Sequence, residues 1–291
     1  MRQPSPYREQ FAGDFSVEHK VSAHNEKSRV HLHDVFEILL VLSDGIQCTV
    51  QSRTYRLRPH TLLLFNNMDL HLLSMSPQAR LNDRYVLYFR PEYIEPLSSA
   101  SVNLLECFFY RRFEDPNVLP LSDREARDIL GLMNQLNYHR NRPENRDAFG
   151  QDLLVKLLLG QLLVRINRLY REKHHIPSDM KTVTYSRIYR VMQYIHKNYA
   201  EKLSLDFLAS RFYIDKSYMC ELFKKITGIS PIQYLIRCRI MKAKELLLRG
   251  YSVDDVCGMA GFNNLTHFSH SFKQHTGKSP KQFQMMMGRE K

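Results

Sequence analysis

The sequence predicts an α+β protein of several domains: a β-barrel near the N-terminus, helices in the middle, and an all-α C-terminal domain with two helix-turn-helix units. Three observations predict it. Short strand-like runs broken by turns fill residues 30–89, leucine-rich helical periodicity follows, and one motif of about a dozen residues occurs twice near the C-terminus. With 291 residues, the chain is long enough for two domains that each have a hydrophobic core.

The predicted barrel carries a patterned group of histidine and acidic residues. Its strand-like runs occupy residues 36–42, 47–50, 61–65 and 85–89, with turn residues at 43–45, 58–59 and 66–67. Within it, His31, His33 and Glu37 have the same parity and would share one face of a strand, and His71 follows later. These four side chains are credible ligands for iron, zinc or nickel. Lining of a small-molecule pocket and structural pairing are the alternatives, and all three stay open.

Two helices are predicted between the barrel and the C-terminal domain, at residues 123–139 and 147–170, with a turn-rich stretch at 141–145. The second carries many aliphatic residues: Leu153, Leu154, Leu157, Leu158, Leu162, Leu163, Val164, Ile166 and Leu169. A helix that packs one face against a single neighbour needs fewer aliphatic residues than this. The set therefore indicates either a helix buried on two sides or a subunit interface. Proline and polar residues at 174–184 then predict a linker between domains.

Basic residues are concentrated in the C-terminal part of the chain. The whole chain has 42 Lys and Arg against 30 Asp and Glu, a formal net charge of +12. Residues 184–291 hold 18 of the basic and 8 of the acidic residues, which leaves +10 in this segment. Such an imbalance indicates nucleic acid or another anionic surface as a partner, although a basic surface that only aids solubility fits the composition too.

Other patterns argue against several classes of protein. The five cysteines are scattered and never spaced C-x-x-C, which predicts reduced thiols in a cytoplasm rather than disulfides or a zinc site. There is no run of about 18 apolar residues, and no apolar signal-peptide core follows the polar N-terminus. We find no Walker loop, no dinucleotide-binding G-x-G-x-x-G and no convincing nucleophile–base pair, so we expect neither an enzyme nor a cofactor.

The duplicated motif is F-K-x-x-T-G-x-S-P-x-Q followed by an aromatic residue; it begins at Phe223 and again 49 residues later at Phe272. Both phenylalanines are expected in the core. The paired positions after them are Gly228 and Gly277, Ser230 and Ser279, Pro231 and Pro280, and Gln233 and Gln282. The glycine suits a left-handed helix end, the serine an N-cap, the proline the first helical position, and the glutamine the second half of a capping box. Each copy therefore ends one helix and begins the next.

A short helix, a tight turn and a longer helix are predicted at each copy of the motif, which forms the seam between that longer helix and the next. The predicted N-caps are Ser204 and Ser252, the turns contain Tyr213 and Gly261, and the longer helices cover residues 216–225 and 264–275. This arrangement is a helix-turn-helix, and the chain has two in series. A continuous helix at 234–248 joins them, and another at 185–199 precedes them. A plain helical-repeat scaffold is the alternative, but two copies are too few for a stable solenoid.

Residues 185–284 resemble the DNA-binding domain of AraC-type (AraC/XylS family) transcription regulators. Besides the two motifs, the likeness includes AKELL at 243–247 in the connecting helix and AGF at 260–262 before the second long helix. The resemblance implies two recognition helices that enter successive major grooves on one face of the DNA, roughly one helical turn apart. The duplication would set two DNA-reading helices in register with two grooves.

The resemblance also implies which side chains meet DNA. Base contacts would come from Ser217, Cys220 and Glu221 in the first unit and from Leu265, Thr266 and His270 in the second. Phosphate contacts would come from Lys216, Lys224, Lys225 and Lys273. An ionised Glu221 only accepts hydrogen bonds, so a cytosine amino group is its natural partner, and Leu265 suits a thymine methyl group. A solvent-facing charge is the alternative for Glu221.

The N-terminal part, residues 20–90, resembles the cupin barrel through its H-x-H-x-x-x-E pattern and later histidine. This likeness implies that His31, His33, Glu37 and His71 bind an effector, and many sensory domains of AraC-type regulators keep a similar signature without an established metal. The sequence departs from the cupin pattern at residues 59–61, where Pro-His-Thr stands in place of the common Pro-Gly-Asp turn. We therefore expect an effector site without a metal ion.

Together these features predict a DNA-binding transcription regulator that responds to a small molecule. The expected domains are a cupin-like effector-binding barrel with an N-terminal arm (1–95), a helical dimerisation region (96–173), a linker (174–184) and a DNA-binding domain (185–291). The effector would be a small molecule such as a sugar, and the partners double-stranded DNA, a second copy of the chain and, for an activator, RNA polymerase. A cupin-type metalloenzyme with an accessory DNA-binding module is the alternative, and it would need a metal with an open coordination position.

Overall fold

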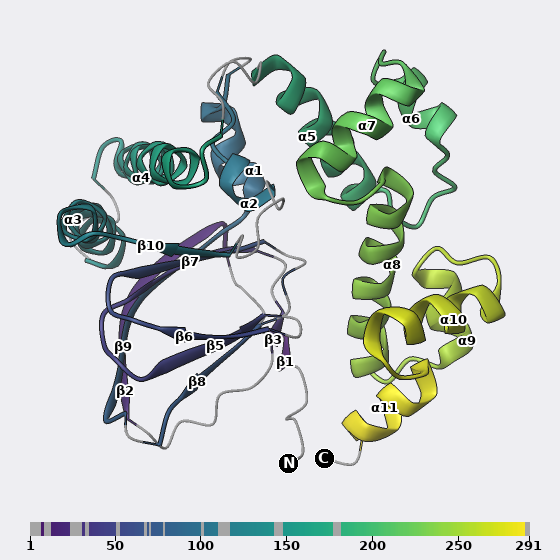
Figure 1. Cartoon of the computed structure of the whole chain (residues 1–291), viewed down its shortest axis with the longest axis horizontal. Coiled ribbons are helices and arrows are strands. Elements are labelled where there is room, and N and C mark those ends of the chain that lie inside the picture. Colours follow the sequence, from purple (N-terminus) through teal and green to yellow (C-terminus); the bar gives the residue numbers. More distant parts are fainter. Residues whose placement is uncertain are drawn as a thin grey trace. The chain divides into compact units, whose positions relative to one another are not determined.

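The computed structural model describes residues 7–8, 13–23, 31–32, 35–50, 53–66, 69, 71–77, 79–99, 102–109, 117–142, 148–176 and 182–288. The chain divides into two compact units, an N-terminal unit that ends at Thr182 and a C-terminal unit that begins at Val183 (Figure 1). The N-terminal unit combines β-sheets with helices, and the C-terminal unit is all helical. The predicted fold class is confirmed.

Two five-stranded sheets face each other in the N-terminal unit (Figure 1). The first has the order β10 (Val118–Pro120), β7 (Thr61–Phe65), β4 (Phe36–Val41), β9 (Leu81–Phe89) and β2 (Phe15–Ala23). The second has the order β1 (Tyr7–Arg8), β3 (His31–Leu32), β8 (His71–Met75), β5 (Ile46–Val50) and β6 (Arg53–Leu57). Neighbours are antiparallel except β1 and β3, and no strand pair joins the two sheets within the described residues. The predicted barrel is therefore a two-sheet, cupin-like sandwich.

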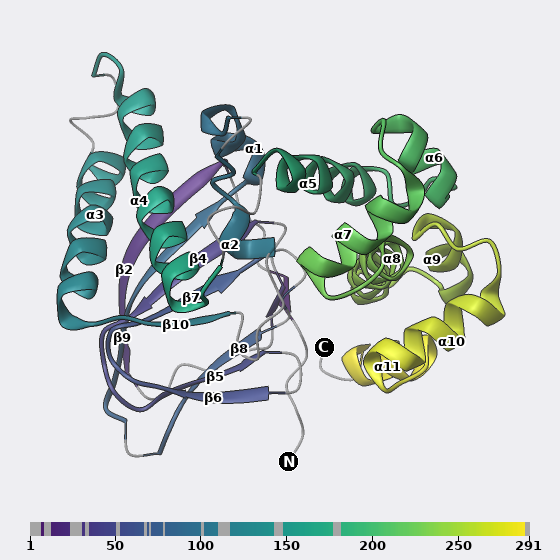
Figure 2. The same ribbon diagram turned by 45° about the horizontal axis from the view of Figure 1, so that its top comes forward.

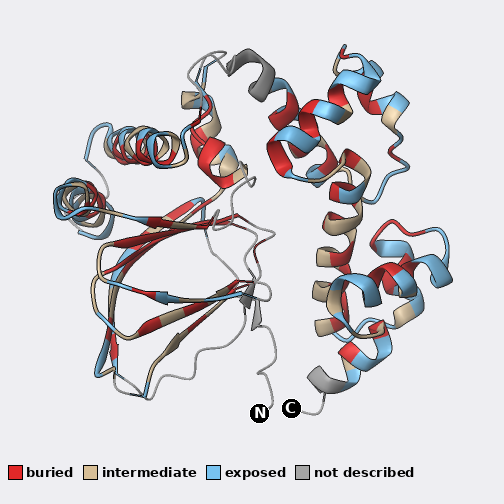
Figure 3. Cartoon of the chain, viewed as in Figure 1, coloured by how far each residue is buried: buried red, intermediate tan, exposed pale blue. Residues whose placement is uncertain are grey.

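The central strands β4 and β7 are buried along their whole length, which Figure 3 shows in red. Their sequences, FEILLV and TLLLF, are continuous apolar runs, because the second sheet covers one face and helices lie over the first sheet's other face. α2 (Glu106–Phe109) contacts β7, and α3 (Asp123–Asn141) contacts β2. The interior between the sheets includes Leu39, Phe65 and Cys48.

A pair of long helices completes the N-terminal unit. α3 and α4 (Gln151–Lys173) lie side by side in Figure 2, and the short helices α1 (Pro91–Ile94) and η1 (Glu95–Leu97) precede them. The Arg171 guanidinium on α4 donates to both carboxylate oxygens of the buried Glu106 at 3.0 Å. Burial raises the pKa of Glu106, and the Arg171 charge limits that rise. Asn167 also donates to the Leu104 carbonyl at 2.8 Å, so α4 is tied to the α2 segment.

Seven helices form the C-terminal unit over the described residues. They are α5 (Thr182–Lys197), α6 (Leu205–Arg211), α7 (Lys216–Thr227), α8 (Pro231–Leu248), α9 (Val253–Met259), α10 (Leu265–Thr276) and α11 (Pro280–Gly288). α6–α7 and α9–α10 are the two predicted helix-turn-helix units, and α8 connects them (Figure 1). The predicted core position of both motif phenylalanines is confirmed, since Phe223 and Phe272 are fully buried.

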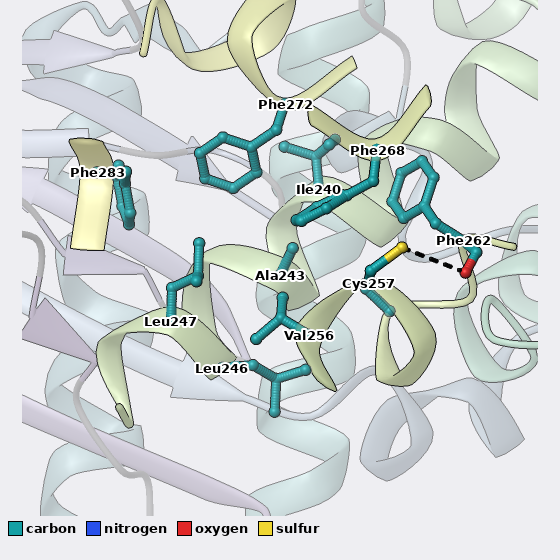
Figure 4. Close-up of a cluster of buried hydrophobic side chains, with 11 residues drawn as sticks. Ile240, Ala243, Leu246, Leu247, Val256, Cys257, Phe262, Phe268, Phe272 and Phe283 are labelled. Atoms are coloured by element: carbon teal, nitrogen blue, oxygen red, sulfur yellow. Dashed lines mark hydrogen bonds between the residues drawn. The ribbon is translucent and has the colours of Figure 1, made fainter. Parts of the chain in front are cut away.

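The second helix-turn-helix unit packs against α8 through a cluster of buried phenylalanines (Figure 4). The ring centroids of Phe268 and Phe272 are 5.7 Å apart, and those of Phe272 and Phe283 are 5.4 Å apart, both edge-on. Ile240 and Ala243 of α8 belong to the same buried cluster. α8 is therefore a core element of the unit as well as a connection.

Helix positions were predicted more accurately than strands. Every long helix starts within four residues of its predicted start, and β7 has the predicted bounds. The strands β1, β2, β6, β8 and β10 were missed. β6 has only one buried residue, Leu57, and β10 has three residues, so neither shows a strong period-two pattern.

Candidate DNA-binding surface and effector-binding residues

The two seams have the geometry that the repeat predicts. Gly228 and Gly277 end their helices with φ values of 78° and 73°, in the left-handed region. The Ser230 hydroxyl accepts from the Gln233 backbone N–H at 3.3 Å, and the Gln233 side chain accepts from the Ser230 N–H at 2.9 Å. The capping box of the second copy, Ser279 with Gln282, is equivalent. These four N–H groups of helix starts are thereby satisfied.

The motif threonine has a role that sequence reasoning missed. The Thr227 hydroxyl donates to the Phe223 carbonyl at 2.8 Å and accepts from the Ile229 N–H at 3.3 Å. Thr276 makes the same two contacts, with Phe272 and Lys278. The threonine therefore ties the helix end to the chain that enters the next helix, and its recurrence in both copies was the available signal.

The tight turns differ between the copies although both use a left-handed residue. Gly261 has φ of 83°, and a Cβ there would lie 2.7 Å from the Ala200 Cα and 2.8 Å from the Tyr199 carbonyl oxygen. Glycine is required at that position because backbone atoms fill the space of a side chain. The equivalent Tyr213 has φ of 51°, and its side chain is 92% exposed. The first copy thus has open space where the second is packed.

Both long helices of the helix-turn-helix units present a polar face. On α7 the predicted base-contact residues Ser217 and Glu221 are exposed, and Cys220 is partly buried. On α10, Leu265, Thr266 and His270 are exposed. Opposite faces of the two helices are buried by Met219, Leu222, Phe223 and Ile226 and by Phe268, Ser271 and Phe272. The predicted readers are therefore not required for the core.

The predicted phosphate contacts Lys216, Lys224, Lys225 and Lys273 are exposed as well. Lys216 is engaged within the unit, because its ammonium lies 2.7 Å from an oxygen of Asp206 on α6. The hydrogen bond to Asp206 and its charge raise the pKa of Lys216. Tyr218, between Ser217 and Glu221, is 50% exposed on the same helix and was not predicted as a contact.

Two basic residues of α8, unlike the exposed lysines of α7 and α10, are partly buried. Arg239 donates from Nε to the Tyr199 carbonyl and from Nη2 to the Glu201 carbonyl, both at 2.8 Å, so it joins α8 to the chain after α5. Burial lowers the pKa of Arg239 and of Lys244. The contacts of Arg239 therefore stabilise the packing of the unit.

Two of the four predicted effector-binding residues meet inside the sandwich. The His71 Nε2 on β8 lies 2.9 Å from the Glu37 Oε2 on β4, and both side chains are almost fully buried. His71 Nδ1 is 2.9 Å from the Asp69 carbonyl oxygen, and the imidazole is stacked on the Phe65 ring with centroids 3.8 Å apart. Burial acts to lower the pKa of His71, but the Glu37 carboxylate outweighs it and the pKa is raised. The arrangement is a buried histidine–carboxylate pair that joins the two sheets.

Further polar groups extend this buried pair. The Asp69 carboxylate accepts from the Asn66 N–H at 2.9 Å and from the Asn117 amide at 3.0 Å, and all three residues are buried. Burial, together with the charges of Glu37 and Asp69, raises the pKa of the Cys48 thiol. Amides and carboxylates of this kind can exchange hydrogen bonds with the hydroxyl groups of a ligand.

The prediction that His31, His33 and Glu37 share one strand face is wrong. His31 is in β3 of one sheet and Glu37 in β4 of the other, because the chain changes sheets between Leu32 and Phe36. Parity has no meaning across such a break. The backbone of His31 is paired with His71, whereas the side chain of His31 and all of His33 lie outside the described residues. Among the described residues, no group of three or more His, Cys, Asp and Glu could hold a metal ion.

None of the helices in the described part of the chain is long and apolar enough to cross a membrane. All five cysteines are free thiols.

Comparison with known proteins gives matches over both units. Residues 19–163 match the family profile described as AraC-like ligand binding domain, and residues 208–286 match one described as helix-turn-helix domain. The HTH-type transcriptional activator RhaS of Escherichia coli is 24% identical over 252 residues, which cover 86% of this chain and 85% of RhaS.

Solved structures were matched as well. ToxT of Vibrio cholerae, crystallised with an unsaturated fatty acid, has a TM-score of 0.49 at 12% identity and covers 96% of this chain and 97% of its own. The DNA-binding domain of AdpA, described as a global transcriptional factor and solved with target DNA, has a TM-score of 0.35 at 27% identity. That alignment covers 36% of this chain and 96% of the AdpA chain.

Proposed function

This chain belongs to the AraC family of DNA-binding transcription regulators, and we propose that its N-terminal unit senses a small molecule that controls the contacts of the C-terminal unit with its DNA site. The observation that carries the proposal is the duplicated helix-turn-helix with two exposed polar helix faces, α7 and α10, joined by one core helix. We propose a regulator and binding protein rather than an enzyme, and a cytoplasmic one because its target is DNA.

We assign the domains as follows. Residues 1–95 form the effector-binding domain with its N-terminal arm, 96–173 the helical dimerisation region, 174–184 the linker, and 185–291 the DNA-binding domain. The end of α4 at Lys173 supports the start of this linker. α5 begins at Thr182, so residues 182–184 of the assigned linker lie in its first turn.

The two exposed helix faces are assigned to DNA recognition. Base contacts are assigned to Ser217, Cys220, Glu221, Leu265, Thr266 and His270, and phosphate contacts to Lys216, Lys224, Lys225 and Lys273. All these side chains except the partly buried Cys220 are exposed on helices whose other faces are buried, which supports the assignment. The lysines would fix the position on the duplex, and the reader residues would select its sequence.

We assign effector binding to the interior of the sandwich around His31, His33, Glu37 and His71. The buried Glu37–His71 pair and the neighbouring amides offer hydrogen-bond donors and acceptors that suit a hydroxyl-bearing molecule such as a carbohydrate. Such a ligand would have to bind one conformation more tightly than another in order to regulate DNA binding.

A homodimer is supported by the exposed half of α4. Phe149, just before the helix, is fully exposed, and Leu153 and Leu157 are 57% and 50% exposed at helical spacing. Leu162 and Leu163 further along are fully buried within the unit. The N-terminal half of α4 therefore has an apolar stripe that a second copy would cover. If the protein activates transcription, RNA polymerase is a further partner.

The test is capture of genomic DNA fragments by the purified full chain at near-physiological salt, followed by sequencing. We expect a few enriched regions that share two short elements roughly ten base pairs apart. Salt matters because a basic domain retains any DNA at low ionic strength. Capture without sequence preference, with and without candidate sugars, would reject specific recognition.

The same assay tests Glu221 as a base reader. Glu221→Gln replaces an acceptor by an amide that also donates, so we expect the preferred base to change at one position of the first element. One good contact of this kind discriminates against the wrong base by about 1–3 kcal/mol. Asp254→Asn, an exposed acidic residue on α9, is the matched control that should leave the preference unchanged.

A further inference from the structure

A pocket of about 390 Å³ lies in the C-terminal unit, and none of the predicted reader residues lines it. Its lining comes from the outer face of α5 and from the end of α6 with the turn that follows: Arg187, Arg190, Tyr194, Arg211, Phe212 and Tyr213. Three of these six side chains are arginine and the other three are aromatic. No function of the unit described above uses them.

The aromatic side chains form an ordered group. The Arg211 guanidinium lies 5.5 Å from the centroid of the Tyr194 ring, which also meets the Phe212 ring edge-on at 5.7 Å. Tyr213 is held at the rim by its left-handed backbone and is 92% exposed. A non-glycine residue in this conformation carries backbone strain. Tyrosine at this turn therefore costs conformational energy that glycine would not.

The charge of the pocket is not compensated. Arg187 and Arg190 are exposed and three residues apart on α5, and within the described residues neither these two nor Arg211 has an ion pair with a carboxylate. Other cations of the same unit do have carboxylate partners: Lys216 pairs with Asp206, and Lys242 and Arg249 pair with Glu245. Three arginines gathered around one cavity thus favour an anion that carries more than one oxygen.

The second helix-turn-helix has no such group. The repeat aligns Arg211, Phe212 and Tyr213 with Met259, Ala260 and Gly261. At Gly261 backbone atoms occupy the space of a side chain, and Ala260 is fully buried. The pocket is therefore an addition to the first copy and not a consequence of the repeated scaffold.

We propose that this arginine–tyrosine pocket binds a phosphate group. Guanidinium groups match phosphate oxygens in bidentate geometry, and the rings of Tyr194 and Phe212 provide an apolar wall for the sugar or base attached to the phosphate. Two sources share this chemistry: a DNA backbone phosphate that flanks the site of α7, and a free nucleotide. Tyr213 stands two residues before Asp215, the N-cap of α7, so the pocket borders the first reader helix.

The experiment compares two double variants of the full chain. Arg187→Gln with Arg190→Gln removes two pocket charges. Arg124→Gln with Arg127→Gln removes two exposed charges of the same spacing from α3 and is the matched control. All four side chains are exposed, so both variants should retain the wild-type melting temperature.

The first arm measures affinity for a duplex that the wild type binds, as a function of salt. With backbone phosphate as the ligand, the slope of log K against log salt concentration should fall by about 0.9 for each lost contact in the pocket variant and stay unchanged in the control. The second arm measures binding of AMP and of adenosine by calorimetry. With a free nucleotide as the ligand, AMP should bind the wild type and the control with similar affinity. It should bind the pocket variant at least about tenfold more weakly. Adenosine should bind none of the three proteins.

Either arm alone supports the proposal and identifies the source. The proposal is overturned if the salt slope of the pocket variant equals that of the control and AMP binds no better than adenosine. It is also overturned if a glutamate-rich peptide binds the pocket while AMP and DNA do not. The DNA arm rests on the proposed function; a wild type without a preferred duplex would reject that function, and the AMP arm would still test the pocket.

Discussion

The two helix-turn-helix units share one set of helix caps and differ at their turns and on the exposed faces of their long helices. Both have a left-handed residue in the turn, a glycine at the end of the long helix and a serine–glutamine capping box at the seam. The first copy has an exposed tyrosine and a basic pocket at its turn, where the second has a glycine packed against the backbone of Tyr199 and Ala200. Local geometry was kept in both copies, and the surfaces that meet other molecules diverged.

The predicted reader faces of the two copies differ in charge as well. The face of α7 carries Lys224, Lys225 and the carboxylate of Glu221, whereas that of α10 has Leu265 and His270 and the single cation Lys273 over the corresponding turns. The first copy is therefore expected to contribute more of the phosphate attraction, and the second more of the apolar and hydrogen-bond readout.

The largest effect is expected from truncation of the paired core phenylalanines. Phe272→Ala and Phe223→Ala should each lower the free energy of unfolding by about 3–5 kcal/mol. Phe272 loses edge-on contacts with Phe268 and Phe283, and Phe223 loses one with Tyr234, so Phe272→Ala should be worse by about 1 kcal/mol. Urea denaturation of the full chain, followed by circular dichroism, measures both. Phe272→Leu and Phe223→Leu are milder controls, and a larger loss for Phe223→Ala would contradict the ranking.

The turns should respond in opposite directions. Gly261→Ala places a Cβ 2.7 Å from the Ala200 Cα in a left-handed conformation, so we expect a loss of about 2–3 kcal/mol. Tyr213→Gly removes an exposed side chain from a strained backbone and should leave stability unchanged or raise it by about 0.5–1 kcal/mol. The same denaturation experiment compares the two. Equal losses would show that the turns are packed alike.

The capping boxes should be equivalent. Ser230→Ala and Ser279→Ala each remove an acceptor of a helix-start N–H, and each should cost about 1 kcal/mol. Thermal melting of the two single variants measures this, and Ser210→Ala on α6, a change at an exposed serine, is the control. A difference much above 0.5 kcal/mol between the copies would reject equivalent caps.

The smallest expected effect is a pH dependence of stability that arises in the second copy alone. Burial and the positive charges of Arg237 and Lys244 lower the pKa of His275, whose equivalent in the first copy is Ile226. The unfolded chain therefore binds this proton more readily, and stability should fall as pH decreases through about 6.5, the ordinary value for histidine. The side chain is largely exposed, so the loss should be a few tenths of a kcal/mol. Melting temperatures from pH 8 to 5 for the wild type and His275→Gln test this; parallel curves would contradict it.

Part of the structure was predictable because it depends on residues close in the chain. Ser230 and Gln233 form hydrogen bonds across three residues, and Gly228 ends its helix by its own conformational freedom. The long helices followed from the spacing of their apolar residues. The exposed readers Ser217 and Glu221 follow from the same spacing, because Phe223 and Met219 fix the buried face of α7.

The proposed effector site was predictable only in part. Glu37 and His71 do meet, but the supposed strand from His31 to Glu37 is broken by a change of sheet. Period-two spacing carries information only while the chain stays in one strand. The buried partners Asp69 and Asn117 gave no signal in the sequence, since their contact joins residues 48 positions apart.

By itself, therefore, the sequence determined the duplicated helix-turn-helix, the caps and turns between its helices, and the membership of a DNA-binding family, because these are local patterns. Only the tertiary structure decided which leucines of α4 are covered, which acidic and histidine side chains meet inside the sandwich, and that Arg187 and Arg211 of different helices line one pocket. The physical reason is the same in each case. These features arise from contacts between segments far apart in the chain, and no periodicity or cap records which distant segments fold against each other.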